Sequence, residues 1–372
     1  MKRLCIYVIY DEDGIIDEYI DYMLRKIKEH VTKLVVVCNF RIISSGESYL
    51  KHADSIFFRE NTGYDFGAWK DVLCKHLGWE CVHQYDELIL SNDSFFGPFY
   101  SFLDVFNTMD KQPVDFWGLT EHPGGEHGGV LYDAHLQSFF YCFKSDILHS
   151  IDFFDYWNSM EYPQEFIDAV LKVETKLTLH FMDAGYRYSS YMMQKLPNYN
   201  KEWNVNPTVS DNYKLIVNGS VPILKRKSIC FYYDGFEETL SAIDYIRSNT
   251  DYDVSLIWNY IFRKCEGNPN YIGYDLKSLE WFYNSHDRVF LYGAGMFGKK
   301  MQSYFLYKKW NFESFVVTSI RDVRENCKNI EQIDFSENDG IIVTVSKLYR
   351  DEILDVLSKY GVDRKNILYG EV

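Results

Sequence analysis

The sequence is poor in proline and in positive charge, and it has no long apolar run. Only 8 of its 372 residues are Pro, and 54 Asp and Glu outnumber 39 Lys and Arg, so the net charge is −15. This excludes the broad basic surface that nucleic-acid binding requires. No window approaches the ~20 apolar residues that span a bilayer, and the N-terminus lacks a signal-peptide pattern. We therefore expect a cytoplasmic protein, with room for peripheral contact at the inner face of the cell membrane.

Paired cysteines and metal-ligand spacings are also missing. The 8 Cys form no CxxC pair, and none has a His at the spacing of a zinc site. This excludes a disulfide framework and a zinc finger. We predict reduced core cysteines at Cys5, Cys38, Cys74, Cys81, Cys142, Cys230, Cys265 and Cys327.

Apolar and aromatic residues, by contrast, are plentiful. The chain is 47% hydrophobic, which is enough for more than one core, and its length favours two domains. Aromatic residues make up 18%, with 31 Tyr and 27 Phe. Such side chains stack on sugar rings and bases, and they also fill cores, so composition alone leaves both interpretations open.

Strand and helix patterns alternate along the first part of the chain, which predicts an α/β domain with a mainly parallel central sheet. Ligands of such sheets bind at the carboxyl ends of the strands. We expect a Gly- and His-rich loop at residues 121–129 to act as a mobile lid, and an irregular segment at 188–227. Strands are predicted at residues 4–10, 34–38, 55–58, 87–91, 115–120 and 135–143, and helices at 16–30, 47–51, 66–76, 147–160, 164–184 and, as a pair, within 235–264.

A second, smaller domain follows the turn-rich segment at residues 266–270 (EGNPN), which gives predicted domains 1–265 and 266–372. A predicted strand at 288–292 runs into GAGMFG at 293–298 and a helix, which is a Rossmann-like pattern. The next strand ends in Thr318 and Ser319, where a ribose-binding acid is needed. We therefore expect no bound NAD and assign this domain a structural or docking role.

Polar residues lie in a turn between a strand and a helix at residues 59–69. Asn61 and Asp65 flank the backbone amides of a helix N-terminus, which can hold a nucleotide base, ribose or phosphate. The alternative is that either residue only caps the helix.

A second polar group follows the buried strand at 87–91, in the run Asn92-Asp93-Ser94. An Asp at a strand end can bind a divalent cation that bridges two phosphates. The alternative is a turn closed by Asn and Ser.

Glu174 is the candidate general base. It lies early in a predicted long helix, and transfer with inversion needs one carboxylate to accept the proton of the acceptor hydroxyl. The alternative is a solvated Glu in a first helical turn, where the helix dipole favours acids.

A local basic cluster stands out in this acidic chain at residues 222–227 (PILKRK). Its Lys225 and Arg226 could hold the diphosphate of a donor or the phosphate of a lipid-linked acceptor, or belong to a solvated surface run. His122, His127 and His135 match no metal-binding spacing.

Several linked motifs together resemble the rhamnan synthesis protein F family over residues 1–235. In chain order they are NTGYDFG at 61–67, YD at 85–86, NDS at 92–94 with GP at 97–98, DFWGLT at 115–120, HLQSF at 135–139 and PILKR at 222–226. A set of ordered motifs is far more specific than any one of them.

The resemblance implies a glycosyltransferase of the GT-A type that makes bacterial cell-surface polysaccharide. The expected reaction is inverting transfer of rhamnose from dTDP-rhamnose to a lipid-linked glycan, with Glu174 as base. Asn92 and Asp93 stand at the metal-binding DxD motif, with Asp93 expected to bind Mg²⁺ or Mn²⁺, although Ser91 replaces the first carboxylate. The residues expected to bind the donor are Asn61, Gly63, Tyr64, Asp65, Asn92, Asp93, Gln137, Lys225 and Arg226.

Two rival functions remain open from the sequence. The missing carboxylate at Ser91 also fits a non-catalytic scaffold of the same pathway, and Gly293, Gly295 and Gly298 fit a dinucleotide-dependent enzyme. The oligomeric state is open as well.

Overall fold

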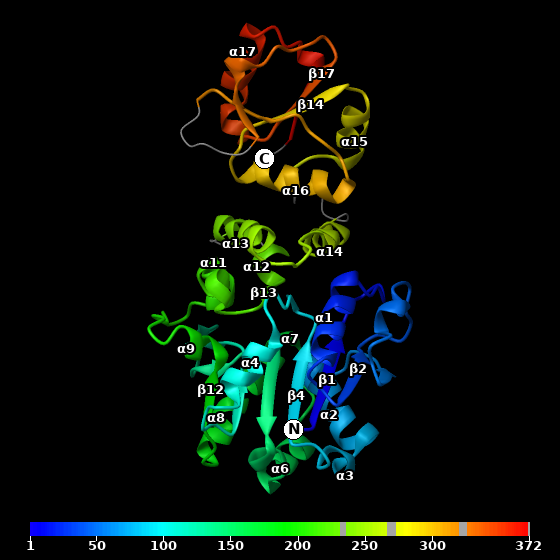
Figure 1. Ribbon diagram of the computed structural model, residues 1–372, viewed down its shortest axis with the longest axis vertical. Coiled ribbons are helices and arrows are strands. Elements are labelled where there is room, and N and C mark those ends of the chain that lie inside the picture. The colour runs from blue at the N-terminus through cyan, green and yellow to red at the C-terminus, as the bar shows by residue number, and fades with distance from the viewer. Residues whose placement is uncertain (231–235, 266–272, 320–325, 371–372) are drawn as a thin grey trace. The chain divides into compact units, whose positions relative to one another are not determined.

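The computed structural model describes residues 1–230, 236–265, 273–319 and 326–370, and its contacts form two compact units, Met1–Asp253 and Val254–Val372 (Figure 1). Helix α14 (Ser255–Cys265) belongs to the second unit, where Phe262 packs against Tyr304 of α16 (Met296–Lys308). The units therefore divide at 253/254, whereas we predicted a division after residue 265. The predicted linker at 266–270 lies outside the described residues.

The first unit is built on a seven-stranded sheet in the order β12-β6-β11-β4-β1-β2-β3. β1 pairs in parallel with β2 and β4, and only β11 runs antiparallel to its neighbours β4 and β6. The strands are β1 (Arg3–Ile9), β2 (Lys33–Cys38), β3 (Ser55–Phe58), β4 (Glu87–Asn92), β6 (Phe116–Gly118), β11 (Phe140–Lys144) and β12 (Tyr188–Ser190).

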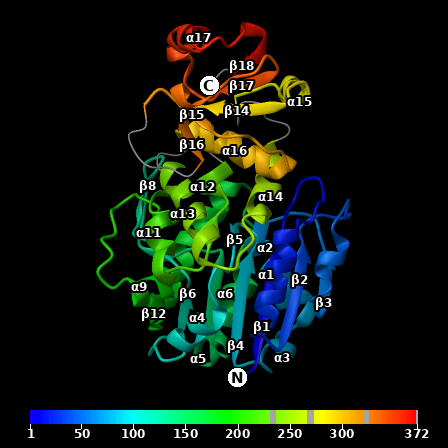
Figure 2. The ribbon, with the colours of Figure 1, turned by 45° about the horizontal axis from the view of Figure 1, so that its top comes forward.

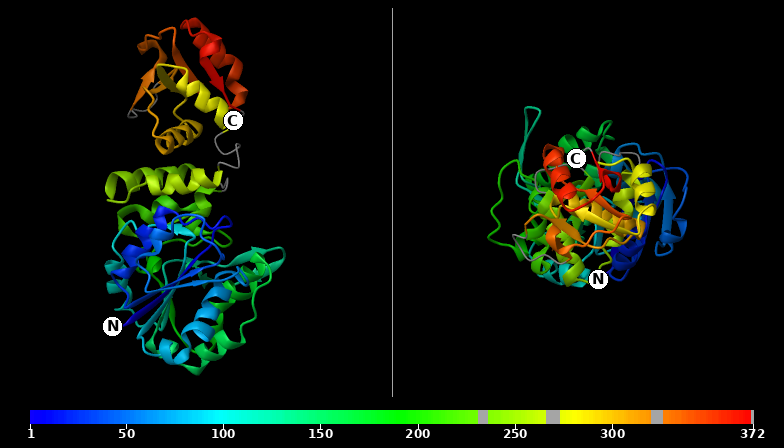
Figure 3. Two further views of the ribbon diagram at one scale, coloured as in Figure 1. Left: turned by 90° about the vertical axis from the view of Figure 1, so that its right-hand side faces the viewer. Right: turned by 90° about the horizontal axis from the view of Figure 1, so that it is seen from above.

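Helices cover both faces of this sheet, which is why its central strands are apolar at nearly every position (Figure 3). The strand residues of one face pack against apolar side chains of three helices, α2 (Tyr64–Asp71), α6 (Ile151–Ser159) and α8 (Thr175–Asp183). On the other face lies α4 (Phe102–Met109), whose Phe102 stacks on Phe140 and whose Phe106 meets Trp117 edge to face. α1 (Glu18–Lys28) is amphipathic, with buried residues at helical spacing from Tyr19 to Ile27.

The second unit has five strands, all parallel, in the order β16-β15-β14-β17-β18 (Figure 2). The predicted GAGMFG turn joins β14 (Arg288–Tyr292) to α16. The remaining elements are β15 (Phe315–Val317), β16 (Cys327–Asn329), β17 (Asp339–Val343), β18 (Ile367–Tyr369), α15 (Leu276–Asn284) and α17 (Arg350–Lys359). The predicted fold class, a large mainly parallel α/β unit with a smaller Rossmann-like one, is confirmed.

The predicted lid is a β-hairpin instead of a loop. β8 (Gly125–His127) pairs antiparallel with β9 (Val130–Tyr132), and Gly128 and Gly129 both have positive φ, as a two-residue hairpin turn requires. The strand predicted at 135–143 is two strands, β10 (His135–Leu136), which pairs with β7 (Glu121–His122), and β11.

The segment predicted as irregular holds short regular elements. They are β12, α9 (Tyr191–Lys195), α10 (Pro207–Ser210), α11 (Asn212–Ile216) and β13 (Leu224–Lys225), with α12 (Lys227–Cys230) and α13 (Phe236–Asn249) following. None of the cysteines whose side chains are described forms a disulfide, as predicted. Cys5, Cys38 and Cys142 are buried, whereas Cys74, Cys81 and Cys327 are only partly buried, so the predicted core position is wrong for these three. Among the described residues no helix has both the length and the apolar character to cross a bilayer.

Candidate functional site

A cavity of about 270 Å³ lies where β4 ends, at the carboxyl edge of the first sheet. Sequence-distant segments supply its walls, and five of the predicted site residues are among them. The lining residues are Asp65, Asn92, Ser94, His122, Tyr132, His135, Gln137, Ser138, Phe139, Phe166, Val170, Glu174, Thr175, Asn206, Val209, Lys225 and Lys227.

Glu174 enters this cavity from the middle of a helix. It ends a π-helical turn, η3 (Ala169–Glu174), between α7 (Phe166–Asp168) and α8, so it does not lie in a first helical turn as the solvated alternative required. Its Oε1 accepts a hydrogen bond of 2.9 Å from the Ser138 amide, which holds the carboxylate in place. π-Turns inside helices recur at functional sites, because the extra residue redirects a side chain.

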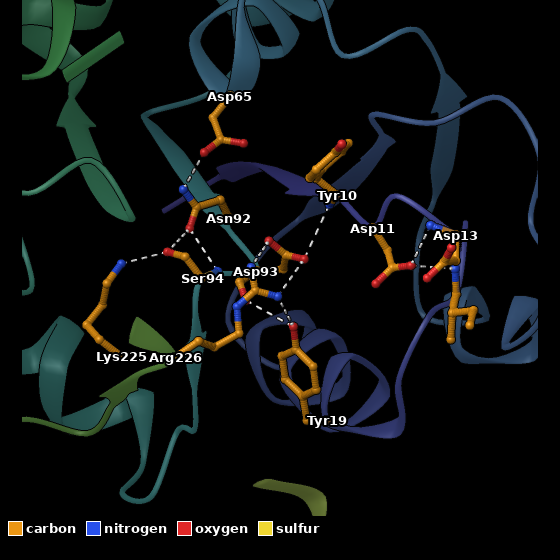
Figure 4. Close-up of polar contacts among 11 residues, drawn as sticks. Tyr10, Asp11, Asp13, Tyr19, Asp65, Asn92, Asp93, Ser94, Lys225 and Arg226 are labelled. Carbon is orange, nitrogen blue, oxygen red and sulfur yellow. Dashed lines mark hydrogen bonds and ion pairs between the residues drawn. The ribbon is translucent and has the colours of Figure 1, made fainter. Parts of the chain in front are cut away.

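A chain of hydrogen bonds joins Asp65 to Lys225 across the cavity floor (Figure 4). Asn92 Nδ2 donates to Asp65 Oδ2 at 2.7 Å, and Ser94 Oγ donates to Asn92 Oδ1 at 2.6 Å. Lys225 Nζ donates in turn to Ser94 Oγ at 2.6 Å, and it also lies 4.2 Å above the Phe139 ring. A carboxyl and an ammonium group thus lie at the two ends of one hydrogen-bond chain in the cavity lining.

The two ends of this chain titrate near neutral pH. Burial, with the charge of Asp93 adding to it, raises the pKa of Asp65 to about 7. Burial and the neighbouring cations Lys227 and Arg226 lower the pKa of Lys225 to about 7. The protonation state of both groups therefore changes with the charge of a bound ligand.

Asp93, the predicted metal ligand, is held by an arginine. Arg226 Nη1 and Nη2 lie 3.2 and 3.3 Å from the two carboxylate oxygens of Asp93, and the Tyr10 amide donates to the same group (Figure 4). Ser91 is fully buried, and its Oγ donates to the Phe139 carbonyl. Within the part of the chain that the structure describes, no three His, Cys, Asp or Glu side chains gather into a metal site. The residues at this point, as arranged, do not fit Mg²⁺ or Mn²⁺.

The turn at residues 61–65 lies beside the cavity. Of the residues in this turn, only Asp65 lines the cavity. Asn61 accepts from Asn39 Nδ2 at 3.1 Å, and Arg59 Nη1 donates to Asn39 Oδ1 at 2.8 Å. Gly63 is the helix N-cap residue of α2 and no side chain caps this helix, so the capping alternative for Asn61 and Asp65 is wrong.

Two backbone positions in this turn are special. Gly63 has φ of +75°, and a Cβ there would lie 2.8 Å from the Tyr162 ring. Tyr64 also has a positive φ, 55°, a strained conformation of the kind that clusters at functional sites.

The other predicted residues divide between the cavity and its surroundings. Gln137 lines the cavity and is oriented by Thr120 Oγ1, which donates to its Oε1 at 2.7 Å. Arg226 is outside the lining, paired with Asp93. Sequence reasoning missed Asn39 and Tyr132, because a single buried Asn after a strand and one Tyr among 31 carry no local signal.

Among solved structures, the chain aligns with two bacterial proteins at low identity. It aligns with TarS 1-349 of S. aureus at 12% identity and a TM-score of 0.31, covering 76% of this chain and 78% of TarS. It also aligns with the glycosyltransferase GlyE of Streptococcus pneumoniae TIGR4 at 12% identity and a TM-score of 0.29, covering 99% and 91%.

One curated relative is the uncharacterized protein y4gN of Sinorhizobium fredii, 25% identical over 189 residues. That match takes in 50% of this chain and 48% of the relative, so the chain spans about half of the relative's length. The family model for rhamnan synthesis protein F matches residues 34–352, which is most of the chain and confirms the resemblance seen in the motifs. The chain therefore belongs to the rhamnan synthesis protein F family.

Proposed function

We propose that this protein is an inverting glycosyltransferase that moves rhamnose from dTDP-rhamnose to a lipid-linked polysaccharide at the cytoplasmic face of the bacterial membrane. Membership of the rhamnan synthesis family supports the pathway. The observation that carries the reaction class is the cavity itself, in which the Glu174 carboxylate shares one space with the Lys225 and Lys227 ammonium groups.

Glu174 supplies the base in this proposal. Its carboxylate takes the proton of the acceptor hydroxyl as the hydroxyl oxygen bonds to the anomeric carbon of the donor. The bond from that carbon to the diphosphate oxygen breaks, and its electron pair leaves with the diphosphate. Because the Ser138 amide occupies Oε1 of Glu174, Oε2 is the oxygen assigned to the acceptor.

Lysines offset the charge of the leaving diphosphate. Lys225 is held toward the cavity by Ser94, and Lys227, whose Nζ lies 4.7 Å above the Phe166 ring, lines the same wall. Cations placed where negative charge develops stabilise the transition state. Phosphate binding also favours the charged form of Lys225, whose pKa burial lowers to about 7.

Recognition of the nucleotide is assigned to the turn beside the cavity. Asn61, Gly63, Tyr64 and Asp65 lie at the N-terminus of α2, and Asn39 and Arg59 orient the turn. Asn92 and Gln137 contact the sugar side of the donor in this proposal, because both line the cavity.

The alternative is the predicted dependence on Mg²⁺ or Mn²⁺. It requires Arg226 to leave Asp93, since the guanidinium now contacts both carboxylate oxygens. Our proposal routes no step through a metal ion and leaves Arg226 as the charge that neutralises Asp93.

The test is thermal-shift binding with a panel of nucleotide sugars, each with EDTA and with Mn²⁺, followed by a transfer assay with the donor that binds. A ligand at ~100 times its Kd stabilises the folded state by ~2.7 kcal/mol. We expect dTDP-rhamnose to give this shift in EDTA and to support transfer. Binding without turnover would favour the scaffold role, and no shift from any nucleotide sugar would contradict the proposal.

A further inference from the structure

Two buried histidines face each other in the wall of the cavity, outside the roles assigned above. His122 of β7 is the register partner of His135 of β10, and their rings stack with centroids 5.4 Å apart and an interplanar angle of 14°. Only 8% and 4% of the two residues are exposed, and both line the cavity together with Tyr132.

Backbone groups fix opposite tautomers for the two rings. Nδ1 of His135 lies 2.8 Å from the Asp133 carbonyl, which can only accept, so this nitrogen carries the proton and Nε2 is an acceptor. Nδ1 of His122 accepts from the Gly124 amide at 3.2 Å. In the neutral ring, Nε2 of His122 is therefore a donor.

Both Nε2 atoms lack a partner within the described parts of the chain. Neither Nε2 atom is sealed from the cavity that the two residues line, so a ligand there can supply the missing hydrogen-bond partners. The His122 ring stays neutral at physiological pH, because burial and the neighbouring His135 lower its pKa to about 4. With both rings in their neutral forms, the site offers one donor and one acceptor.

We propose that His122 and His135 bind two neighbouring hydroxyl groups of a sugar ring, with His122 donating to one hydroxyl and His135 accepting from the other. A hydroxyl group can both donate and accept, which suits this pair. The diphosphate of a nucleotide sugar has only acceptors to offer at neutral pH, so the Nε2 of His135, itself an acceptor, disfavours it. The inference rests on the proposed function and names the residues that select the sugar. This sugar belongs either to the donor or to the acceptor.

The test uses the variants His122→Phe and His135→Phe. Each removes the hydrogen bonds of one imidazole ring and keeps an aromatic ring for stacking. His127→Phe is the matched control, because His127 is exposed and lies on β8, in the hairpin that connects β7 to β10. The probes are dTDP-rhamnose as donor, methyl rhamnoside as acceptor sugar, and the monodeoxy forms of the rhamnoside.

We expect either variant to raise one KM at least tenfold and the control to change none. A raised KM for dTDP-rhamnose assigns the pair to the donor sugar, and a raised KM for the rhamnoside assigns it to the acceptor. In the acceptor case, the penalty that wild type shows for one deoxy rhamnoside disappears in the matching variant. KM values within twofold of wild type for both substrates, in folded variants, would overturn the inference.

Two further measurements keep the inference separate from the proposed function and from folding. Saturation-transfer NMR of methyl rhamnoside needs no turnover, so sugar binding lost only in the His variants supports the inference even if no transfer occurs. If wild type shows neither sugar binding nor a measurable KM, the inference fails. Should a Phe variant melt early, His135→Gln, which retains an acceptor oxygen, is expected to recover most of the affinity, and equal losses in both would indicate a structural role.

Discussion

Each of the two units places a glycine-containing turn between a strand and a helix, and in the first unit this turn adjoins a charged cavity. In the first unit Gly63 opens α2, and Asp65, Lys225 and Glu174 line the space nearby. In the second unit Gly293 follows β14, and a Cβ at Gly298 would lie 2.1 Å from the Gly293 carbonyl oxygen. Gly293, with a φ of +109°, and Gly298 are thus required by backbone conformation and close packing whether or not a dinucleotide binds, whereas Gly295 is not.

The comparison teaches that charged groups gathered at strand ends mark a site better than a glycine motif does. β15 is followed in the described chain by Thr318 and Ser319, whereas β4 ends in Asn92 and is followed by Asp93. We keep the prediction that the second unit binds no NAD.

The largest expected effect, which would sharpen this contrast between the two units, is the fall in kcat when the proposed base Glu174 is removed. Glu174→Gln keeps an oxygen for the Ser138 amide and removes the proton acceptor, so we expect kcat to fall about 10²- to 10⁴-fold with little change in donor KM. Glu165→Gln is the control, because Glu165 is exposed and immediately precedes α7. A kcat within threefold of wild type would mean that a residue other than Glu174 is the base.

The next effect is on the pH dependence of donor binding. Lys225 has a pKa of about 7 and is charged below it, so affinity for dTDP should fall as the pH rises from 6 to 8, by about tenfold for a lost charged hydrogen bond. Asp65 ionises over the same range and acts in the same direction. Lys225→Arg, which stays charged, should flatten most of the profile in calorimetric titrations, and an unchanged slope would exclude Lys225 as its source.

A smaller effect concerns stability. The pKa of Asp65 is about 7 in the folded chain against an ordinary value of 3.8, so the folded state disfavours the carboxylate and stability is lost as the pH rises between these values. Asp65→Asn should therefore raise Tm relative to wild type, with a gain that grows from pH 4 to 7 and then levels off. Melting curves across this range test it, and a gain independent of pH would point to another cause.

The smallest effects are expected in the second unit. Gly295→Ala should leave Tm almost unchanged, since no atom lies within 4 Å of a Cβ there and its φ is negative. Gly298→Ala should cost about 1–3 kcal/mol, because the added methyl meets the backbone. Saturable NADH fluorescence in wild type, lost in Gly295→Ala, would give this turn a binding role.

Local patterns in the sequence account for much of the fold. The predicted bounds of β3 and β14 are those observed, because short apolar runs between turn residues define them. The antiparallel direction of β11 and the split of the strand before it were not predictable, since strand direction depends on distant pairing. The π-turn at Glu174 likewise has no local signature.

The site was predictable only as separate pieces. The strand-end rule identified Asn92 and Asp93, but the partner that occupies Asp93 is Arg226, 133 residues later in the chain. The tautomers of His122 and His135 depend on the backbone of their own turns, which spacing does not reveal.

The most direct test of the central claim, that lysines at this sheet edge hold the donor diphosphate, is calorimetric titration of dTDP and dTDP-rhamnose in EDTA. Wild type is compared with Lys225→Gln and with Lys195→Gln, a lysine outside the cavity. The account predicts binding without metal, weakened at least tenfold by Lys225→Gln and unchanged by Lys195→Gln. Binding that requires Mn²⁺, or that is indifferent to Lys225→Gln, would contradict it.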